Sequence, residues 1–481
     1  MNRRMVVFLL SRILAIEAVL MLPSVFVGIV YREAASWCFL PAIGVLALLG
    51  LFGIKKPKNT AIYAREGFLT VGLSWVLMSV FGAVPFWLSG KFNTYWDCFF
   101  EIVSGFTTTG ASILSAVEEL PHCMLFWRSF SHWVGGMGVL VFVLAVMPMS
   151  EERSMHLMRA EVPGPVVGKL VPRMRDTAKI LYGVYTAMTL VLILLLWIGG
   201  MPLFDSICHA FGAAGTGGFS IKNTGIAYYN SAYIDIVLSV FMLLFGVNFS
   251  LYHLILIKKA KTALRSEELH VYLGIVAAAV ILITINTFSI THKLGLTVRN
   301  ALFQVSSIIT TTGYATVDFD KWPAFSKMIL VLLMMIGACA GSTGGALKVS
   351  RVVILFKTAR QEIRKLLHPR AISVVRMEGQ PINDSLLRAT LSFFLMYIAF
   401  LAGGTLLLSL DEADFTTNFT AAVACLGNIG PGLAKIGPTA NYGFYSGWAK
   451  VLLSFEMLLG RLELFPIVIL FSPLTYRQSF K

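Results

Sequence analysis

The sequence predicts an all-α protein that crosses a membrane many times and repeats one structural unit four times. The first observation is composition: 57% of the 481 residues are hydrophobic and 13% are charged. The mean hydropathy of +0.77 is far from that of soluble domains. The second observation is the length of the apolar runs, many of which reach about 18 residues and can cross a bilayer as helices. The third is a short loop rich in threonine and glycine that recurs four times.

One column of glycines defines the repeated loop. Aligned on that column, the loops read TTTGAS, GTGGFS, TTTGYA and GNIGPG. Their spacing is nearly constant, and a constant period marks a structural unit. The fourth loop departs most from the others, so we do not expect exact fourfold symmetry. The aligned glycines are Gly110, Gly218, Gly313 and Gly430.

The alignment extends upstream into a short segment that we expect to be helical. Before each loop stands a residue of a type that can cap a helix, and between that residue and the loop stands a small residue. This pattern predicts two to three turns of helix with a capped start and a small side chain on one face. The predicted caps are Asp97, Asp205, Asn300 and Thr417, and the small residues are Ser104, Gly212, Ser307 and Ala424. Each unit is therefore an apolar run, a short helix, a loop and a second apolar run.

Four such loops around one axis favour a ring of backbone carbonyls that can replace the hydration shell of a cation. Glycine allows a positive φ, so that successive carbonyls can point the same way. The short helix behind each loop directs its partly negative C-terminal end at the cavity below, which also favours a cation. One chain would thus supply all four quarters of a pore.

Further motifs accompany the loops. They are Trp127-Arg128-Ser129, Gly135-Gly136-Met137-Gly138, Gly341-Ser342-Thr343-Gly344-Gly345 and Gly460-Arg461-Leu462-Glu463. Together with the loops, they resemble the Trk/Ktr/HKT superfamily of potassium transporters, and most closely its bacterial TrkH/TrkG branch, over almost the whole chain. The resemblance implies four M1–pore helix–M2 repeats around one pore, plus an N-terminal two-helix hairpin, with about ten transmembrane helices in all.

The resemblance also implies a function. We expect potassium uptake across the bacterial inner membrane through a gated, channel-like selectivity filter, with potassium as the bound and transported ion and no cofactor. The implied potassium-binding residues of the filter are Thr107, Thr108, Thr109, Gly110, Gly215, Thr216, Gly217, Gly218, Thr310, Thr311, Thr312, Gly313, Gly427, Asn428, Ile429 and Gly430.

Two other function classes are open at this point. A secondary carrier could symport potassium with protons or sodium, although carriers usually show paired inverted repeats rather than four parallel loops. A membrane enzyme would need a clustered acid, base, nucleophile or metal site. His122, His132, His253 and Cys339 lie in separate segments without such a motif, so we expect no enzymatic activity.

The second apolar run of the third repeat predicts a gate. It contains Gly337, Gly341, Ser342, Thr343, Gly344 and Gly345. Each glycine inside a helix costs about 1 kcal/mol relative to alanine, so we expect irregular backbone here, which at membrane depth is buried or lines a cavity. A simple packing kink is the alternative.

Arg461 lies in the last apolar run, and in the resembling family the matching arginine faces the ion path below the filter. The alternative is that the Arg461 side chain extends to the cytoplasmic interface of the membrane. We predict that Arg461 hydrogen-bonds the carbonyls of the glycine-rich segment and the hydroxyls of Ser342 and Thr343, and so closes the path.

Pore repeats and connecting segments divide the chain. The net charge of +14 comes from basic blocks between apolar runs, as expected from the positive-inside rule rather than from nucleic-acid binding. Both termini are expected in the cytoplasm. The predicted divisions are a hairpin (1–66), repeat one (67–149), a cytoplasmic linker that is a docking surface or a passive connector (150–179), repeat two (180–268), repeat three with the gating helix (269–378) and repeat four (379–481).

The chain has no nucleotide fold of its own, yet many of its basic residues lie in segments expected to face the cytoplasm. The resemblance implies a cytosolic nucleotide-binding regulatory subunit, similar to TrkA, that docks there, and a homodimer within the lipid bilayer. We expect charge reversal at Arg364 and Lys365 to weaken this docking.

Overall fold

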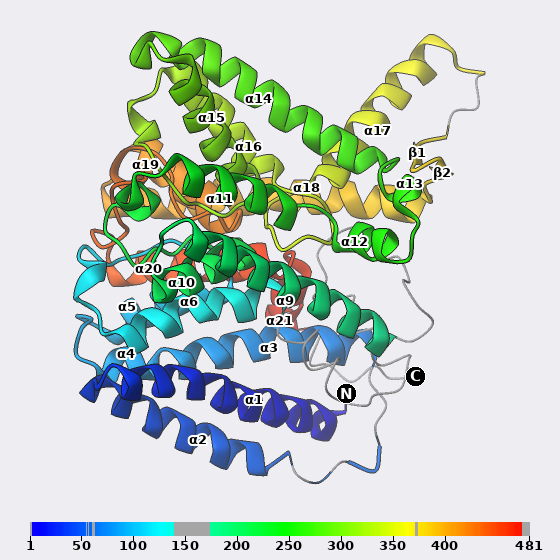
Figure 1. Ribbon diagram of the computed structural model, residues 1–481. Coiled ribbons are helices and arrows are strands. Elements are labelled where there is room, and N and C mark those ends of the chain that lie inside the picture. Colours follow the sequence, from blue (N-terminus) through cyan, green and yellow to red (C-terminus); the bar gives the residue numbers. More distant parts are fainter. Residues whose placement is uncertain are drawn as a thin grey trace.

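The computed structural model describes residues 2–53, 55, 57–59, 63–138, 174–370 and 374–473. Regular structure in these parts is almost wholly helical, which confirms the predicted all-α fold. The exception among them is a hairpin of two short antiparallel strands, β1 (Arg376–Met377) and β2 (Gln380–Pro381). Figure 1 shows long helices side by side, with α1 and α2 along one edge.

The described helices follow the repeated order that the loops predict. The N-terminal hairpin is α1 (Arg3–Val30) and α2 (Phe39–Leu51). The first helices of the repeats are α3 (Ala64–Gly82) with its continuation α4 (Val84–Leu88), α9 (Met174–Ile198), α14 (Glu267–Thr291) and α18 (Asp384–Leu408). The pore helices are α5 (Tyr95–Phe106), α10 (Leu203–Gly215), α15 (Leu294–Ile309) and α19 (Phe415–Leu426).

The second helices are α6 (His122–Gly136), α11 (Ala232–Phe245), α16 (Ala324–Ile336) and α20 (Gly447–Arg461). They are short, and within the described residues α11, α16 and α20 are each followed by a further helix after a break. The segments after the breaks are α12 (Phe249–Leu256) with α13 (Ala260–Ala263), α17 (Val349–Leu367) and α21 (Phe465–Phe471). Short 3-10 turns lie at Ala34–Cys38, Val117–Glu119, Gly225–Tyr229, Phe319–Lys321, Ser409–Asp411 and Ala434–Ile436.

Within the described chain, six helical segments are long and apolar enough to cross a membrane, or seven if the bent pair of α11 and α12 is one span. The two members of that pair meet at 90°. The expected number of about ten also counts the second helix of every repeat. Because α6, α16 and α20 have only 13 to 15 residues, they fall short of the roughly 20 that a straight span needs.

The predicted linker at 150–179 lies mostly outside the described residues. Its last part is helical, because α9 begins at Met174, before the predicted start of repeat two.

The predicted helix caps are wrong. Thr94 caps α5 by accepting a hydrogen bond from the Asp97 backbone N–H at 3.2 Å, and the Asp97 carboxylate accepts one from the Thr94 N–H at 3.1 Å. Asp414 likewise caps α19 at the Thr417 N–H, at 3.1 Å. The other two predicted caps lie inside α10 and α15. Polar residues at the third helical position also serve the first turn. The sequence pattern marked the right helices, but three residues too late in α5, α10 and α19 and seven residues too late in α15.

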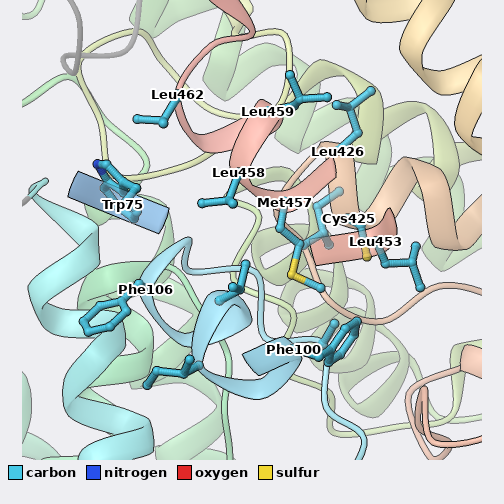
Figure 2. Close-up of a cluster of buried hydrophobic side chains, with 14 of the residues drawn as sticks. Trp75, Phe100, Phe106, Cys425, Leu426, Leu453, Met457, Leu458, Leu459 and Leu462 are labelled. Atoms are coloured by element: carbon cyan, nitrogen blue, oxygen red, sulfur yellow. The ribbon is translucent and has the colours of Figure 1, made fainter. Parts of the chain in front are cut away.

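Each pore helix packs against the second helix of the preceding repeat. α10 contacts α6, α15 contacts α11, α19 contacts α16, and α5 contacts α20. The last pairing joins repeat four to repeat one and closes a ring. Figure 2 shows part of the core at this seam, where Phe100 of α5 lies near Met457 of α20. A buried ion pair crosses the same seam, with Lys450 Nζ 2.7 Å from Asp97 Oδ1.

Glu33 fastens the N-terminal hairpin to the first repeat. Its carboxylate accepts hydrogen bonds from the backbone N–H groups of His122 (2.8 Å) and Cys123 (3.0 Å) at the start of α6, and lies 2.8 Å from His122 Nδ1. The ring of Tyr31 stacks on His122 at 4.0 Å between centroids. Burial acts to raise the pKa of Glu33, but these hydrogen bonds favour the charged form and leave the pKa below its ordinary 4.5.

Candidate functional site

The four loops repeat one unusual backbone pattern. The residue two before each column glycine has a left-handed φ: 56° at Thr108, 56° at Thr216, 58° at Thr311 and 54° at Asn428. The column glycines also have positive φ, between 73° and 95°. Left-handed backbone is rare for residues other than glycine and clusters at functional sites. Alternating the hand of the backbone in this way turns successive carbonyls toward one side.

The column glycines show that the four loops close into a ring. A Cβ atom on each glycine would meet a backbone carbonyl of the next loop at less than 3.0 Å, which real Cβ atoms essentially never show. The contacted carbonyls run in cyclic order: Gly110 meets Gly217, Gly218 meets Thr312, Gly313 meets Ile429, and Gly430 meets Thr109. The last contact is the widest, at 2.7 Å, and it involves the loop that departs most from the pattern.

All four column glycines line one cavity of about 130 Å³. Aromatic and polar residues of the segments beyond each loop complete its wall, among them Tyr314, Tyr442 and Lys222. Of the sixteen predicted filter residues, the four column glycines line this opening, and their contacts place the four loops in one ring.

Side chains brace the loops from behind. Thr107 Oγ1 lies 2.8 Å from Thr109 Oγ1, and Thr310 Oγ1 lies 2.8 Å from Thr312 Oγ1. In the fourth loop, Asn428 Nδ2 donates to Thr109 Oγ1 at 3.0 Å and to the Met457 carbonyl. These threonines are buried and bond to one another, so backbone carbonyls rather than hydroxyls are the groups left for an ion.

The predicted irregular segment lies between α16 and α17, next to the filter. It is fixed on three sides: the Gly345 N–H donates to Thr311 Oγ1 of the filter at 2.8 Å, the Cys339 N–H donates to the Gly246 carbonyl at 3.0 Å, and the Ala340 N–H donates to Glu268 Oε1 at 2.7 Å. A packing kink would not need these bonds. The segment is a structured buried loop.

Arg461 reaches this loop, as the sequence predicts. Its Nη1 donates to the Thr343 carbonyl at 2.8 Å, while Nη2 donates to the carbonyls of Gly136, at 2.6 Å, and Gly135 at the end of α6. The arginine thus ties repeats one, three and four together, and at 6% exposure it does not reach for the interface.

The two hydroxyls of this loop donate to other carbonyls. Ser342 Oγ donates to the Cys339 carbonyl and Thr343 Oγ1 to the Phe245 carbonyl. Backbone carbonyls serve Arg461, while the Ser342 hydroxyl bonds within the loop and the Thr343 hydroxyl bonds the end of α11.

Sequence reasoning assigned no supporting role to several charged residues at the site, although Arg128 and Glu463 lie in the quoted motifs. Arg128 Nε lies 2.6 Å from Glu101 Oε1 in a buried ion pair behind the first two loops. Lys348 is buried, and its Nζ donates to the Gly344 carbonyl. Arg351 pairs with Glu463 at 2.5 Å. The available signal was the presence of charged residues inside apolar runs, which are functional candidates by default.

Comparisons with known proteins identify the family. The family model of TrkH, described as a cation transport protein, matches residues 43–291 and 269–479. The chain is 35% identical to the Trk system potassium uptake protein TrkH of Salmonella typhimurium, over 97% of each chain. It is 36% identical to TrkG of Escherichia coli K12, over 95% of each.

A solved structure agrees in fold and in extent. The crystal structure of the potassium transporter TrkH from Vibrio parahaemolyticus superposes with a TM-score of 0.89 at 30% identity, covering 99% of this chain and 100% of that one. The closed ring of loops, the arginine below it and these similarities agree: the chain belongs to the TrkH family of cation transport proteins.

Proposed function

We propose that this chain takes up potassium through a gated, channel-like filter. The observation that carries the proposal is the closed ring of four loops, whose column glycines face one cavity. The printed names of the relatives, Trk system potassium uptake proteins, support the choice of ion.

The chemistry of the ring favours a monovalent cation. Each of the sixteen filter residues is uncharged, so the ligands are carbonyl dipoles directed by left-handed backbone. Divalent cations in proteins are usually held by carboxylates. Carbonyl rings instead suit ions that lose their hydration shell easily.

The loop between α16 and α17, residues 337–345 with Arg461, is the proposed gate. It is packed against the filter through the Gly345 to Thr311 hydrogen bond, and Arg461 holds it to α6 and α20. A cytoplasmic partner that pulls on α17 would move this loop, because α17 begins at Val349, directly after it.

We further propose a multi-pass location in the bacterial inner membrane with both termini in the cytoplasm, a homodimer, and regulation by a cytosolic nucleotide-binding subunit similar to TrkA. The long helices and the relatives' place in the Trk system support this arrangement. The basic residues of α17, including Arg360 and Arg364, supply charge for the contact.

Symport with protons or sodium is the second candidate. The feature that favours it is Glu456 in α20, a buried carboxyl without a hydrogen-bond partner among the described residues. A carboxyl in such surroundings can carry a proton across a transport cycle.

Flux into proteoliposomes separates the candidates. Purified protein is reconstituted with defined gradients of potential, pH and sodium, and rubidium or potassium uptake is measured. We expect uptake to follow the potassium electrochemical gradient whether or not pH and sodium gradients are present. Uptake that requires a proton or sodium gradient would establish symport, and uptake absent under all gradients would contradict potassium transport.

A further inference from the structure

The second loop lacks side chains where the first and third loops have them. Thr107 and Thr109 brace the first loop, and Thr310 and Thr312 brace the third, in each case through contact of the two hydroxyls at 2.8 Å. The matching residues of the second loop are Gly215 and Gly217. Their φ values are not in the left-handed region, so backbone conformation does not require glycine at either position.

His132 of α6 fills the missing volume. The residue is fully buried, and a Cβ atom on Gly217 would overlap its imidazole ring. The ring also meets Phe219 edge to face, with centroids 4.2 Å apart and planes at 81°. A Cβ atom on Gly215 would overlap the His132 backbone carbonyl. The imidazole of His132 thus takes the place of a threonine side chain at Gly217, and the backbone of the same residue excludes one at Gly215.

The contact bears directly on the ring of carbonyls. Gly217, which His132 touches from behind, carries the carbonyl that occupies the Cβ space of Gly110 in the first loop. If Gly217 moved away from Gly110, the gap between the first and second loops of the filter would widen.

α6 also holds the outer ends of the same two loops. One helical turn before His132, Arg128 donates from Nη1 to the Ser220 carbonyl at 2.8 Å and lies 3.5 Å from the centroid of the Phe219 ring. Its partner Glu101 accepts from the Ile113 N–H at 3.0 Å. These bonds fix where the loops leave the filter, whereas His132 supports the middle of the second loop.

Neither ring nitrogen of His132 has a hydrogen-bond partner within the described structure. The imidazole therefore acts through its shape and volume. Close-packed interiors respond to volume changes as small as one methylene group, and the ring is several times larger.

We propose that His132 is a positioning residue for ion selectivity, whose imidazole fills the space of the threonine side chain missing at Gly217 and holds the Gly217 carbonyl in the ring. This inference rests on the proposed function, because it assumes that the ring selects potassium.

The test is a double-mutant cycle between His132→Ala and Gly217→Thr. His132→Ala leaves space behind Gly217, and we expect the potassium-to-sodium permeability ratio in proteoliposomes to fall about tenfold, with His132→Asn intermediate. Gly217→Thr alone collides with the imidazole and should lower both flux and Tm. The double variant regains a side chain like that of the first and third loops. Its potassium-to-sodium permeability ratio should therefore exceed that of His132→Ala, and its Tm should exceed that of Gly217→Thr.

Val134→Ala is the matched control, because it removes buried volume from the opposite face of α6 and should keep the wild-type ratio. The proposal is overturned if His132→Ala and His132→Asn keep the wild-type ratio, or if His132→Ala fails to raise the Tm of Gly217→Thr. The Tm values of the double-mutant cycle can be measured whether or not the protein transports potassium. Absent potassium flux in the wild type would contradict the proposed function, while the Tm cycle would still decide whether His132 and Gly217 are in steric contact.

Discussion

Gly110 is confined by the loop beside it. Its φ of 79° and the nearby Gly217 carbonyl both exclude a side chain. We expect Gly110→Ser to push the two loops apart and to lower the potassium-to-sodium permeability ratio about tenfold, which corresponds to roughly 1.4 kcal/mol. Reversal potentials in reconstituted membranes measure this ratio.

Gly90 provides the matched control for that substitution. Its φ of 66° is also left-handed, but no atom lies within 4 Å of the Cβ that a side chain would add. Gly90→Ser should share the backbone strain and keep the selectivity. Equal ratios in Gly110→Ser and Gly90→Ser would contradict the assignment of Gly110 to the filter.

Individual residues differ in how well the sequence predicts their roles. The column glycines were predictable because the same steric requirement recurs four times in one chain. The support of the second loop by His132 was not, because the contact joins two repeats and appears in the sequence only as two missing threonines. Arg461 was predictable as a charge in an apolar run, but its bonds to Gly135 and Gly136 depend on tertiary packing.

At the scale of elements, the broken second helix of repeat three makes the clearest prediction. Arg461→Ala removes the donors that hold the loop at the Thr343 carbonyl, so we expect basal potassium flux to rise severalfold. Deleting residues 342–344 should have the same effect, because it removes the accepting carbonyl. Flux measured without any partner protein tests both variants.

Arg299→Ala is the control for the arginine substitution. Arg299 pairs with Asp235 at 3.3 Å and is partly exposed, so its loss should leave basal flux unchanged. If Arg461→Ala and the loop deletion insert normally and conduct no more than Arg299→Ala, the loop is not a gate.

The N-terminal hairpin gives a prediction about pH. The folded state holds the pKa of Glu33 below its ordinary 4.5, so its contribution to stability is complete above that pH and is lost as the pH falls through the lower folded-state value. Glu33→Gln should lower stability at pH 7 by on the order of 1 kcal/mol.

Thermal unfolding of the detergent-solubilised protein at pH 7 and near pH 4 measures this contribution. The advantage of the wild type over Glu33→Gln should be smaller at the lower pH. A difference between the two proteins that stays constant across this range would show that Glu33 does not fasten the hairpin through its charge.

At the scale of the whole molecule, the basic face of α17 predicts how a partner docks. Lys365 is about half exposed and pairs with Glu362 within α17, so this pair lies on an accessible face. We expect Arg364→Glu combined with Lys365→Glu to weaken binding of a nucleotide-binding regulatory subunit at least tenfold. Binding to the purified protein, measured at two salt concentrations, tests this, because screening should reduce the wild-type affinity as well.

Lys91→Glu, in the loop before α5, changes charge by the same amount per residue outside α17 and serves as the control. If it weakens binding as much as the α17 pair does, the contact reflects net charge rather than this surface. Full nucleotide-dependent regulation of the chain without any partner would contradict the docking proposal altogether.

The overall architecture could be predicted because hydropathy, period and loop composition all indicate the same unit. The number of membrane crossings was harder to predict, since the second helices are interrupted after α11, α16 and α20. An interrupted helix is stable only through the contacts it makes, such as the Cys339 N–H to Gly246 carbonyl bond, and such contacts join residues far apart in the chain.

The pairing of α5 with α20 has a consequence for biosynthesis. Asp97 and Lys450 lie 353 residues apart, so α5 leaves the ribosome long before the helix that completes its surroundings. At about 5–20 residues per second, the interval is on the order of 20 to 70 s. During that time the carboxyl of Asp97 is in the membrane or at its surface without its ammonium partner. The nascent chain must therefore keep its first quarter open until its last helices are inserted, and a chain released early cannot form a conducting ring.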